Sequence, residues 1–500
     1  MRTIWYMGAK TRLAGDIQAA IGRAAPSAGC ALDLMSGTGA VAQALAGRGD
    51  LRVVANDVQR YAAAIARARL VHPVDPTRVA DALDPQVDLG RAYHDNARAL
   101  LEPLADAVAL EDAFLLASGL APETPDPEVG ALFPLPSDPA RLRRAQRHVP
   151  RDPRERARAY RAFALQGTPR FQEGREAPPE GGFAGVFRPA RALYSAATVE
   201  ARRRDPWLRP WLLSSVYWPN VYLGLRQAIA LDSLRGAIEA LPARDALARQ
   251  KRELWLAALL HALSVTTSAT SHFCQPRGLS SDAEVQAVQE RRAVSLCSRT
   301  FAYARELAEA AAAAPRRADH AVFACDWRAL YARHWDQVAA DVVYVDPPYT
   351  ADNYSRFYHV LEVVTAWDHP PLQNGGATKG RYPARETRHR SPFCVRGQVE
   401  RELAAVVEET ARRGAALVLS YGEENGLLLR RWREGGLSAA EARARFQALA
   451  GAGYRQVELV ERALLHSGQG DSNHRVTELL LVARAPRSRG VGRKGRSSCA

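Results

Sequence analysis

The stretch Cys30–Gly39, CALDLMSGTG, decides the fold class. Its apolar first half predicts a short buried strand, and its Ser-Gly-Thr-Gly end predicts a tight turn, because glycine adopts backbone conformations that other residues avoid. A helical pattern follows over 40–46, and a second apolar run covers 52–55. Strand, glycine turn, helix and strand in this order open a doubly wound α/β sheet.

The same pattern returns in the second half of the chain. It predicts further strands at 321–325, 341–345, 415–421, 454–462 and 475–483, with the last two forming an antiparallel pair. We therefore expect residues 1–70 and 318–484 to form one split α/β domain. Residues 71–317 would be inserted between its second and third strands, and the basic, glycine- and serine-rich residues 485–500 would be a disordered tail.

The predicted insertion is mainly helical. Apolar residues recur at helical spacing in 225–241 and 252–263, and 302–314 is an alanine-rich helix. Residues 122–139 and 174–185 have the composition of loops. Arginines are dense over 141–161, which suits either a surface that follows phosphates or a solvated charged helix.

The composition favours a polyanionic partner. The 500 residues carry 68 lysines and arginines against 54 acids, a net charge of +14, and such an excess favours nucleic acid because neutralised phosphates release counterions. Six scattered cysteines without a Cys-x-x-Cys pair indicate neither a disulfide framework nor a zinc site, and we predict no metal. No run of 18 apolar residues and no signal-peptide pattern occur, so we expect a cytoplasmic protein that does not bind membranes.

The glycine turn and the strand after it have the features of a nucleoside site. Asp33, Gly37 and Gly39 lie where a ligand approaches the backbone, and Asp57, at the end of the second strand, can accept hydrogen bonds from both ribose hydroxyls. A purely structural turn and a dinucleotide site remain alternatives. The spacing is not G-x-G-x-x-G and no phosphate-binding lysine follows, so a nucleoside without phosphates, as in S-adenosylmethionine, fits better.

Two further segments suit the same cofactor. Tyr6 and Lys10 precede the first strand, and the Lys10 ammonium can pair with the carboxylate of a methionine-like ligand; a solvated lysine is the alternative. Asp326 ends the predicted strand at 321–325 and can reach the cofactor's adenine, although an exposed strand-end aspartate is nearly as well supported.

The strongest signal is Asp346-Pro347-Pro348-Tyr349, directly after an apolar strand. Two consecutive prolines fix φ and make the turn rigid. An exocyclic amine is a weak nucleophile because its lone pair is delocalised into the ring. Asp346 and the Pro347 carbonyl can accept both amino hydrogens and so direct that lone pair at a methyl donor. Tyr349 can stack on the base, which must flip out of a duplex to be reached.

With these motifs in order (YMGAK, DLMSGTG, AND, an insertion, DPPY), the chain resembles the α-group DNA adenine methylases, the DNA adenine methylase and DpnII-type family. Trp218-Pro219-Asn220, residues 230–235, Ser271-His272-Phe273, 354–359, Ser391-Pro392-Phe393 and 476–479 extend the resemblance. Residues 85–210 do not share it. Met35 replaces a usual phenylalanine and Ala9 a usual glycine or serine.

The resemblance implies a Rossmann-like, seven-stranded class I methyltransferase sheet with a large helical insertion for target recognition. It also implies that Tyr6, Lys10, Asp57 and Asp346 contact S-adenosylmethionine. We expect an enzyme that methylates N6 of adenine in double-stranded DNA, in restriction-modification or phage defence, with a restriction endonuclease or other defence proteins as partners. The alternatives are an N4-cytosine methyltransferase and a catalytically silent DNA-binding specificity subunit. For His272 and His359 we favour buried, hydrogen-bonded positions over contact with DNA.

Overall fold

A computed structural model describes residues 10–121, 137–168, 182–270, 272–315, 317, 319–467 and 473–486. Within these ranges the chain divides into two compact units, which are described separately. The helical unit comprises 67–314 and 355–389, and the sheet unit comprises the residues up to 66, 315–354 and those from 390 onward. Residues 355–389 were predicted to belong to the split α/β domain, but they belong to the helical unit.

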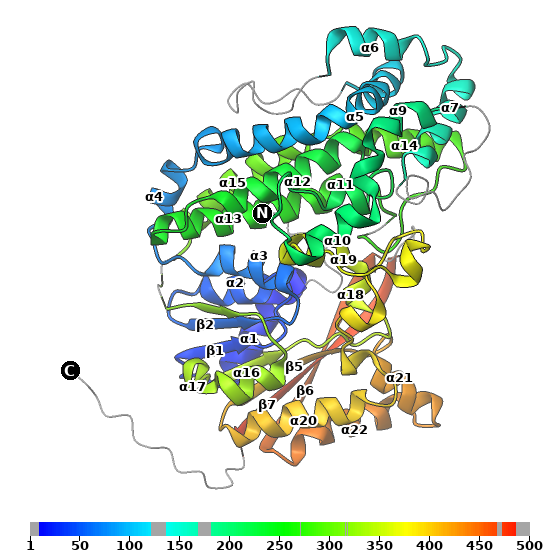
Figure 1. Ribbon diagram of the computed structural model, residues 1–500. Coiled ribbons are helices and arrows are strands. Elements are labelled where there is room, and N and C mark those ends of the chain that lie inside the picture. Colours follow the sequence, from blue (N-terminus) through cyan, green and yellow to red (C-terminus); the bar gives the residue numbers. More distant parts are fainter. Residues whose placement is uncertain are drawn as a thin grey trace. The chain divides into compact units, whose positions relative to one another are not determined.

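The sheet unit contains a seven-stranded sheet in the order β3-β2-β1-β4-β5-β7-β6 (Figure 1). Strands β3 to β5 in that order pair in parallel, and β7 pairs antiparallel to both β5 and β6. This is the predicted Rossmann-like sheet, and it confirms the fold class. The strands are β1 (Cys30–Asp33), β2 (Arg52–Asn56), β3 (Ala321–Phe323), β4 (Val342–Val345), β5 (Ala416–Gly422), β6 (Tyr454–Ser467) and β7 (Asn473–Pro486).

The direction of the strand order changes between β1 and β4, which makes this the topological switch point of the sheet. From β1 the chain runs to β2 and β3 on one side, and β4 and β5 lie on the other. Ligands of doubly wound sheets bind outside the carboxyl ends of the strands at such a switch point. Asp33, the last residue of β1, is in register with Tyr344 of β4, so the carboxyl ends of both strands lie together at this switch point.

Helices pack against the sheet, which is why its parallel strands are mostly apolar. All seven residues of β5 are buried. One face packs its alternate side chains, among them Leu32, Val343 and Leu417, against α16, α20, α21 and α22. The helices of this unit are η1 (Lys10–Leu13), α1 (Ala14–Ala24), α2 (Ala40–Ala46), α3 (Arg60–Leu70), α16 (Trp327–Arg333), α17 (Trp335–Val338), η7 (Pro392–Cys394), α20 (Val399–Arg412), α21 (Leu427–Glu434) and α22 (Ala439–Gly451).

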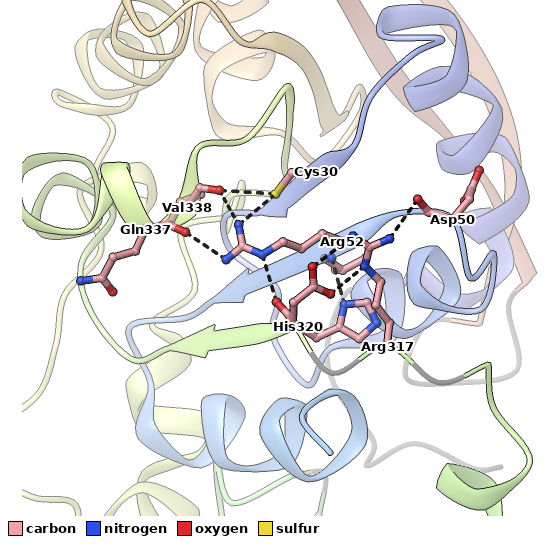
Figure 2. Close-up of polar contacts among 9 residues, drawn as sticks. Cys30, Asp50, Arg52, Arg317, His320, Gln337 and Val338 are labelled. Carbon is pink, nitrogen blue, oxygen red and sulfur yellow. Dashed lines mark hydrogen bonds and ion pairs between the residues drawn. The ribbon is translucent and has the colours of Figure 1, made fainter. Parts of the chain in front are cut away.

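Arg52, the first residue of β2, forms hydrogen bonds with the segments that precede β3 and β4 (Figure 2). Its guanidinium donates hydrogen bonds of 2.9 Å to the carbonyls of Asp319, Gln337 and Val338. The Val53 amide donates to Nδ1 of His320 at 3.0 Å. These bonds fix β3 beside β2, so that the carboxyl ends of both strands lie at the edge where the candidate site is found.

The helical unit is built around α12, whose residues from Ala228 to Ile238 are all buried. Its helices α5, α12, α13 and α15 pack on one another (Figure 1). The helices of this unit are α4 (Pro76–Asp81), η2 (Gln86–Gly90), α5 (Arg91–Ala117), α6 (Pro139–Gln146), α7 (Pro153–Gln166), α9 (Ala184–Phe187), η4 (Arg188–Tyr194), α10 (Ala196–Arg204), α11 (Ser214–Tyr217), α12 (Leu225–Ala240), α13 (Ala246–Thr266), α14 (Asp282–Ala293), α15 (Leu296–Ala312), α18 (Tyr354–Phe357), α19 (His359–Ala366), η5 (Gln373–Gly376) and η6 (Arg385–Thr387).

Some predictions fall outside the described residues: most of the loop at 122–139, residues 174–181 of the second loop, and residues 487–500 of the predicted tail. The first two residues of that predicted tail, 485 and 486, are ordered as the end of β7. In the part of the chain that is described, no helix combines the length and apolarity needed to cross a bilayer. Nor do three or more His, Cys, Asp or Glu side chains gather there in a group that could hold a metal ion.

Candidate active site

The glycine turn after β1 is held by the end of β2. The Ser36 amide donates to the Asn56 carbonyl at 2.9 Å, and the Gly37 amide donates to Oδ2 of Asp57 at 2.9 Å. The other oxygen of Asp57 accepts the Gln59 amide at 2.8 Å. Burial raises the pKa of Asp57 to about 6. Asp57 therefore shapes the turn, while each carboxylate oxygen keeps a second lone pair for a ligand hydroxyl.

Gly39 must be glycine for two reasons. Its φ is +80°, which other L-residues rarely adopt, and it begins α2. A β-carbon at this position would lie 3.0 Å from the Cβ of Ala66. Gly37 also has a positive φ, of 52°. The turn thus lies tightly between β1 and α3, and two of its four residues carry no side chain.

Asp33 points an unsatisfied acceptor into this region. Its side chain is buried; Oδ2 accepts the Ala42 amide at 3.1 Å, while Oδ1 has no hydrogen-bond partner among the described residues. Burial, reinforced by the nearby Asp346 carboxylate, raises the pKa of Asp33 well above its usual range. A buried acceptor of this kind is costly unless a ligand donor or a proton satisfies it.

Asp346 follows β4 directly, and Lys10 binds its carboxylate. The Lys10 ammonium lies 3.1 Å from Oδ1 of Asp346, although the two residues are 336 positions apart in the chain. The side chain of Lys10 is 5% exposed, so the alternative of a solvated lysine is wrong. Burial raises the pKa of Asp346 to about 7, against the opposing effect of Lys10.

The Lys10 ammonium has two more neighbours. It lies 3.1 Å from Oε1 of Glu478 on β7 and donates to the hydroxyl of Tyr349 at 3.4 Å. Burial alone would lower the pKa of Lys10, but Asp346 and Glu478 reverse this and hold it well above its usual value. The contact with Glu478 is an ion pair, because Oε1 of Glu478 has no hydrogen-bond partner among the described residues. Binding of a cofactor carboxylate by Lys10 stays a prediction.

Tyr349 completes the turn. Its carbonyl accepts the Leu427 amide at 2.7 Å, and its ring lies 5.5 Å from the ring of Tyr421. Lys10 also lies 4.9 Å from the ring centre, a cation–π contact that favours this orientation. A β-carbon on Gly422 would come within 2.9 Å of the Tyr349 ring. The ring is therefore fixed from β5 as well as from within the turn.

The remaining predicted residues lie differently. Pro347 is buried and Pro348 half-buried between Asp346 and Tyr349, and the Pro348 carbonyl faces Sγ of Cys394 at 3.7 Å. Asp326 caps α16 by accepting the Arg328 amide at 2.9 Å, and makes none of the contacts described above. Tyr6 lies outside the described residues.

Sequence reasoning missed Glu478 and Gly422 as site residues. Glu478 stood in a quoted motif, but its role needed the strand pairing that sets it opposite Gly422. One signal was available: an acid at the head of the apolar run Leu479–Ala483 is costly to bury without a partner.

Several residues of the resemblance, among them Trp218, Asp232 and His359, are buried in the helical unit. His359 is buried, with Nδ1 2.8 Å from the Arg356 carbonyl and Nε2 3.2 Å from the Gly380 carbonyl, which confirms its predicted buried position. Trp218 packs edge-on against it. His272 is half-buried, with its ring 5.1 Å from that of Tyr358. Asp232 accepts the amides of residues 213–215.

Comparison with known proteins points to one family. Residues 302–385 match the family described as D12 class N6 adenine-specific DNA methyltransferase. The chain is 44% identical over 36 residues to a protein named modification methylase LlaI from Lactococcus lactis subsp. lactis (7% of this chain, 6% of the relative). It is 33% identical over 94 residues to one named type II methyltransferase M.FokI from Planomicrobium okeanokoites (19% and 13%). The chain thus spans only a small part of these curated relatives.

No solved structure gives a significant match. The matched segment includes β3, β4 and the whole DPPY turn, where the geometry described above is concentrated. Over residues 302–385 the chain is therefore similar to the D12 class N6 adenine-specific DNA methyltransferase family.

Proposed function

We propose that this protein transfers the methyl group of S-adenosylmethionine to N6 of adenine in double-stranded DNA. One observation carries the proposal: Asp346, in the family-matched segment, holds a half-buried carboxylate at the carboxyl end of β4, paired with Lys10 and beside the Tyr349 ring. An acceptor rigidly set next to an aromatic ring suits a flipped base that presents an amino group.

The residues present fit S-adenosylmethionine. The turn at Gly37 and Gly39 leaves the backbone open to a ligand, the unsatisfied Oδ1 of Asp33 offers a buried acceptor, and Asp57 lies at the end of β2. These groups line the switch point, where nucleosides bind in such sheets. When bound, the cofactor would supply a methyl group activated by its sulfonium charge.

The protein's own residues would then act on the amine. Asp346 and the Pro347 carbonyl accept hydrogen bonds from the two N–H groups of the amine. These bonds localise the nitrogen lone pair and direct it toward the methyl group. Tyr349 stacks on the flipped base and offsets part of the cost of unstacking, on the order of a few kcal/mol. Lys10 keeps the Asp346 carboxylate in place while the base enters.

The test is transfer of a labelled methyl group from S-adenosylmethionine to duplex DNA, followed by digestion and identification of the methylated nucleoside. We expect N6-methyladenine. N4-methylcytosine would reject adenine in favour of the closely related chemistry. DNA binding without any transfer would favour the catalytically silent specificity subunit.

For the DNA partner, an arginine-rich surface on the helical unit gives support. We call it the α6–α7 surface, formed by the exposed residues Arg143, Arg144, Arg147, Arg151, Arg154 and Arg158. None of the six forms an ion pair within the described ranges, whereas Arg141 beside them pairs with Asp106 at 2.8 Å. Unpaired arginines on adjacent helices suit the phosphates of a duplex.

Changing Arg143, Arg144 and Arg147 together to glutamine is expected to weaken DNA binding about tenfold or more at physiological salt. The slope of log affinity against log salt should flatten by roughly 0.9 for each phosphate that the variant no longer neutralises. Fluorescence anisotropy with a labelled duplex over a salt series measures both. Methyl transfer at saturating DNA should stay close to that of the wild type.

The matched control changes Arg396, Arg412 and Arg430, three exposed arginines of the sheet unit that pair with Glu434, Glu409 and Glu434. This triple removes the same charge from arginines that already have partners, so affinity and slope should barely change. Equal losses in both triples would show that only net charge matters and that the α6–α7 surface is not a binding surface.

The names of the two relatives, a modification methylase and a type II methyltransferase, suggest a biological setting. We propose that the protein modifies a specific DNA sequence and so protects it from a restriction endonuclease or another defence nuclease. Methylation confined to one short sequence, which then resists cleavage, would support this role.

A further inference from the structure

Glu478 is the charged group of the candidate site that the proposed chemistry does not use. It lies on β7, opposite Gly422 of β5, with a side chain only 5% exposed. Its sole ion pair within the described ranges is with Lys10, at 3.1 Å, the same distance that separates Lys10 from Asp346. One ammonium thus lies between two carboxylates from strands on either side of β5.

The charges in this cluster do not balance. Two carboxylates share the single positive charge of a buried lysine, so the cluster carries an excess of negative charge whenever both are ionised. Lys10 then neutralises neither of them completely, because each draws on the same ammonium. An ionised Glu478 therefore leaves Asp346 more basic than Lys10 alone would leave it.

This matters because Asp346 needs negative charge to act. A carboxylate fully neutralised by a dedicated lysine is a weak acceptor for amino hydrogens, whereas one that shares its lysine is a stronger acceptor. We propose that Glu478 is a positioning residue: through the shared Lys10 ammonium it holds Lys10 at the DPPY turn and sets how much charge Asp346 keeps for the substrate amine. This inference rests on the proposed function.

Three other titratable groups interact electrostatically with Asp346. Asp33 on β1 lies close enough for each carboxylate to act on the other, and Tyr344 and Tyr349 also face the cluster. Burial raises the pKa of Asp346 to about 7; Lys10 opposes this effect and Glu478 adds to it. Removing the Glu478 charge should therefore lower the pKa of Asp346, and removing its neighbour Lys10 should raise it.

The test variant is Glu478→Gln, which keeps size and removes charge. In protein labelled with ¹³C at the aspartate carboxyls and free of added ligands, the Asp346 signal is assigned by its absence from Asp346→Asn. We expect its titration midpoint to fall by about one pH unit. In methyl-transfer assays the acidic limb of the kcat profile should move down by the same amount, with a plateau a few-fold lower and an unchanged KM for S-adenosylmethionine.

The matched control is Glu402→Gln. Glu402 is an equally buried glutamate of the sheet unit, but it pairs with Arg328 and does not act on Asp346. Its change should leave the Asp346 titration unmoved. Glu478→Asp keeps the charge, so its Asp346 midpoint should stay near that of the wild type. If the glutamine variant is unstable, this second variant separates the effect of charge from damage to the fold.

An Asp346 midpoint that stays fixed or rises in Glu478→Gln would overturn the proposal, as would an equal shift in the Glu402 control. Because the titration needs neither DNA nor cofactor, it remains decisive if the wild type methylates no adenine. A wild type that methylates no adenine would reject the proposed function but not the proposed role of Glu478.

Discussion

Replacing Asp346 with alanine is expected to lower kcat for methyl transfer by on the order of 10²- to 10⁴-fold, the range seen when a group acting on the reacting atoms is removed. The substrate amine would lose the acceptor that localises its lone pair. Labelled-methyl transfer to duplex DNA under saturating conditions measures the loss.

Binding of S-adenosylmethionine should largely survive in this variant, because Gly37, Gly39 and Asp57 do not depend on Asp346 for their hydrogen bonds. Isothermal titration calorimetry checks this. Asp336→Ala serves as the control: it removes an exposed aspartate from α17, before β4 rather than after it, and activity should stay within about threefold of wild type. An Asp346→Ala enzyme with near wild-type kcat would refute the assigned chemistry.

Replacing Lys10 with methionine is expected to destabilise the sheet unit by roughly 3–5 kcal/mol near neutral pH, the usual cost of leaving buried charges without their partner. Asp346 and Glu478 would then face one another without a cation, in positions where their side chains are 18% and 5% exposed. Calorimetric unfolding of both proteins measures the loss.

The pH dependence has a definite sign. Without Lys10, the folded-state pKa of Asp346, which burial already raises, rises further above its unfolded value, so the folded state takes up protons more readily as pH falls. The deficit relative to wild type should be largest at pH 8 and shrink toward pH 5. Adding Glu478→Gln to Lys10→Met removes one unpaired carboxylate and should recover part of the stability. A double variant that loses stability additively would contradict the shared-ammonium geometry.

Much of the sheet was predictable because each strand leaves a local signature. Apolar runs at 30–35, 52–55 and 341–345 became β1, β2 and β4, with ends shifted by one or two residues. The terminal antiparallel pair was also predicted, but both strands are longer than expected. The residues beyond the predicted end of β6 begin with the apolar run Ala463–Leu465, which does not alternate with polar residues, so periodicity could not mark where the strand ends.

The candidate site was predictable only where its residues lie in one short motif or stand out by their rarity. Asp346 and Tyr349 belong to the same DPPY turn, and Lys10 was singled out as one of four lysines. Glu478 reaches the same ammonium only through the pairing of β7 with β5, which no local pattern reveals. Asp326, the strand-end acid predicted to reach the cofactor's adenine, caps the helix that follows it, and its contact with a ligand stays a prediction.

The central claim, methylation of adenine N6 in duplex DNA, is tested most directly in a living host without DNA methylation of its own. Wild type and Asp346→Ala would be expressed in parallel, and the genomic DNA read by single-molecule sequencing of modified bases. We predict N6-methyladenine at one short recognition sequence in cells with the wild type and none in cells with the variant. Unmodified DNA in both, or modification at cytosine, would contradict the account.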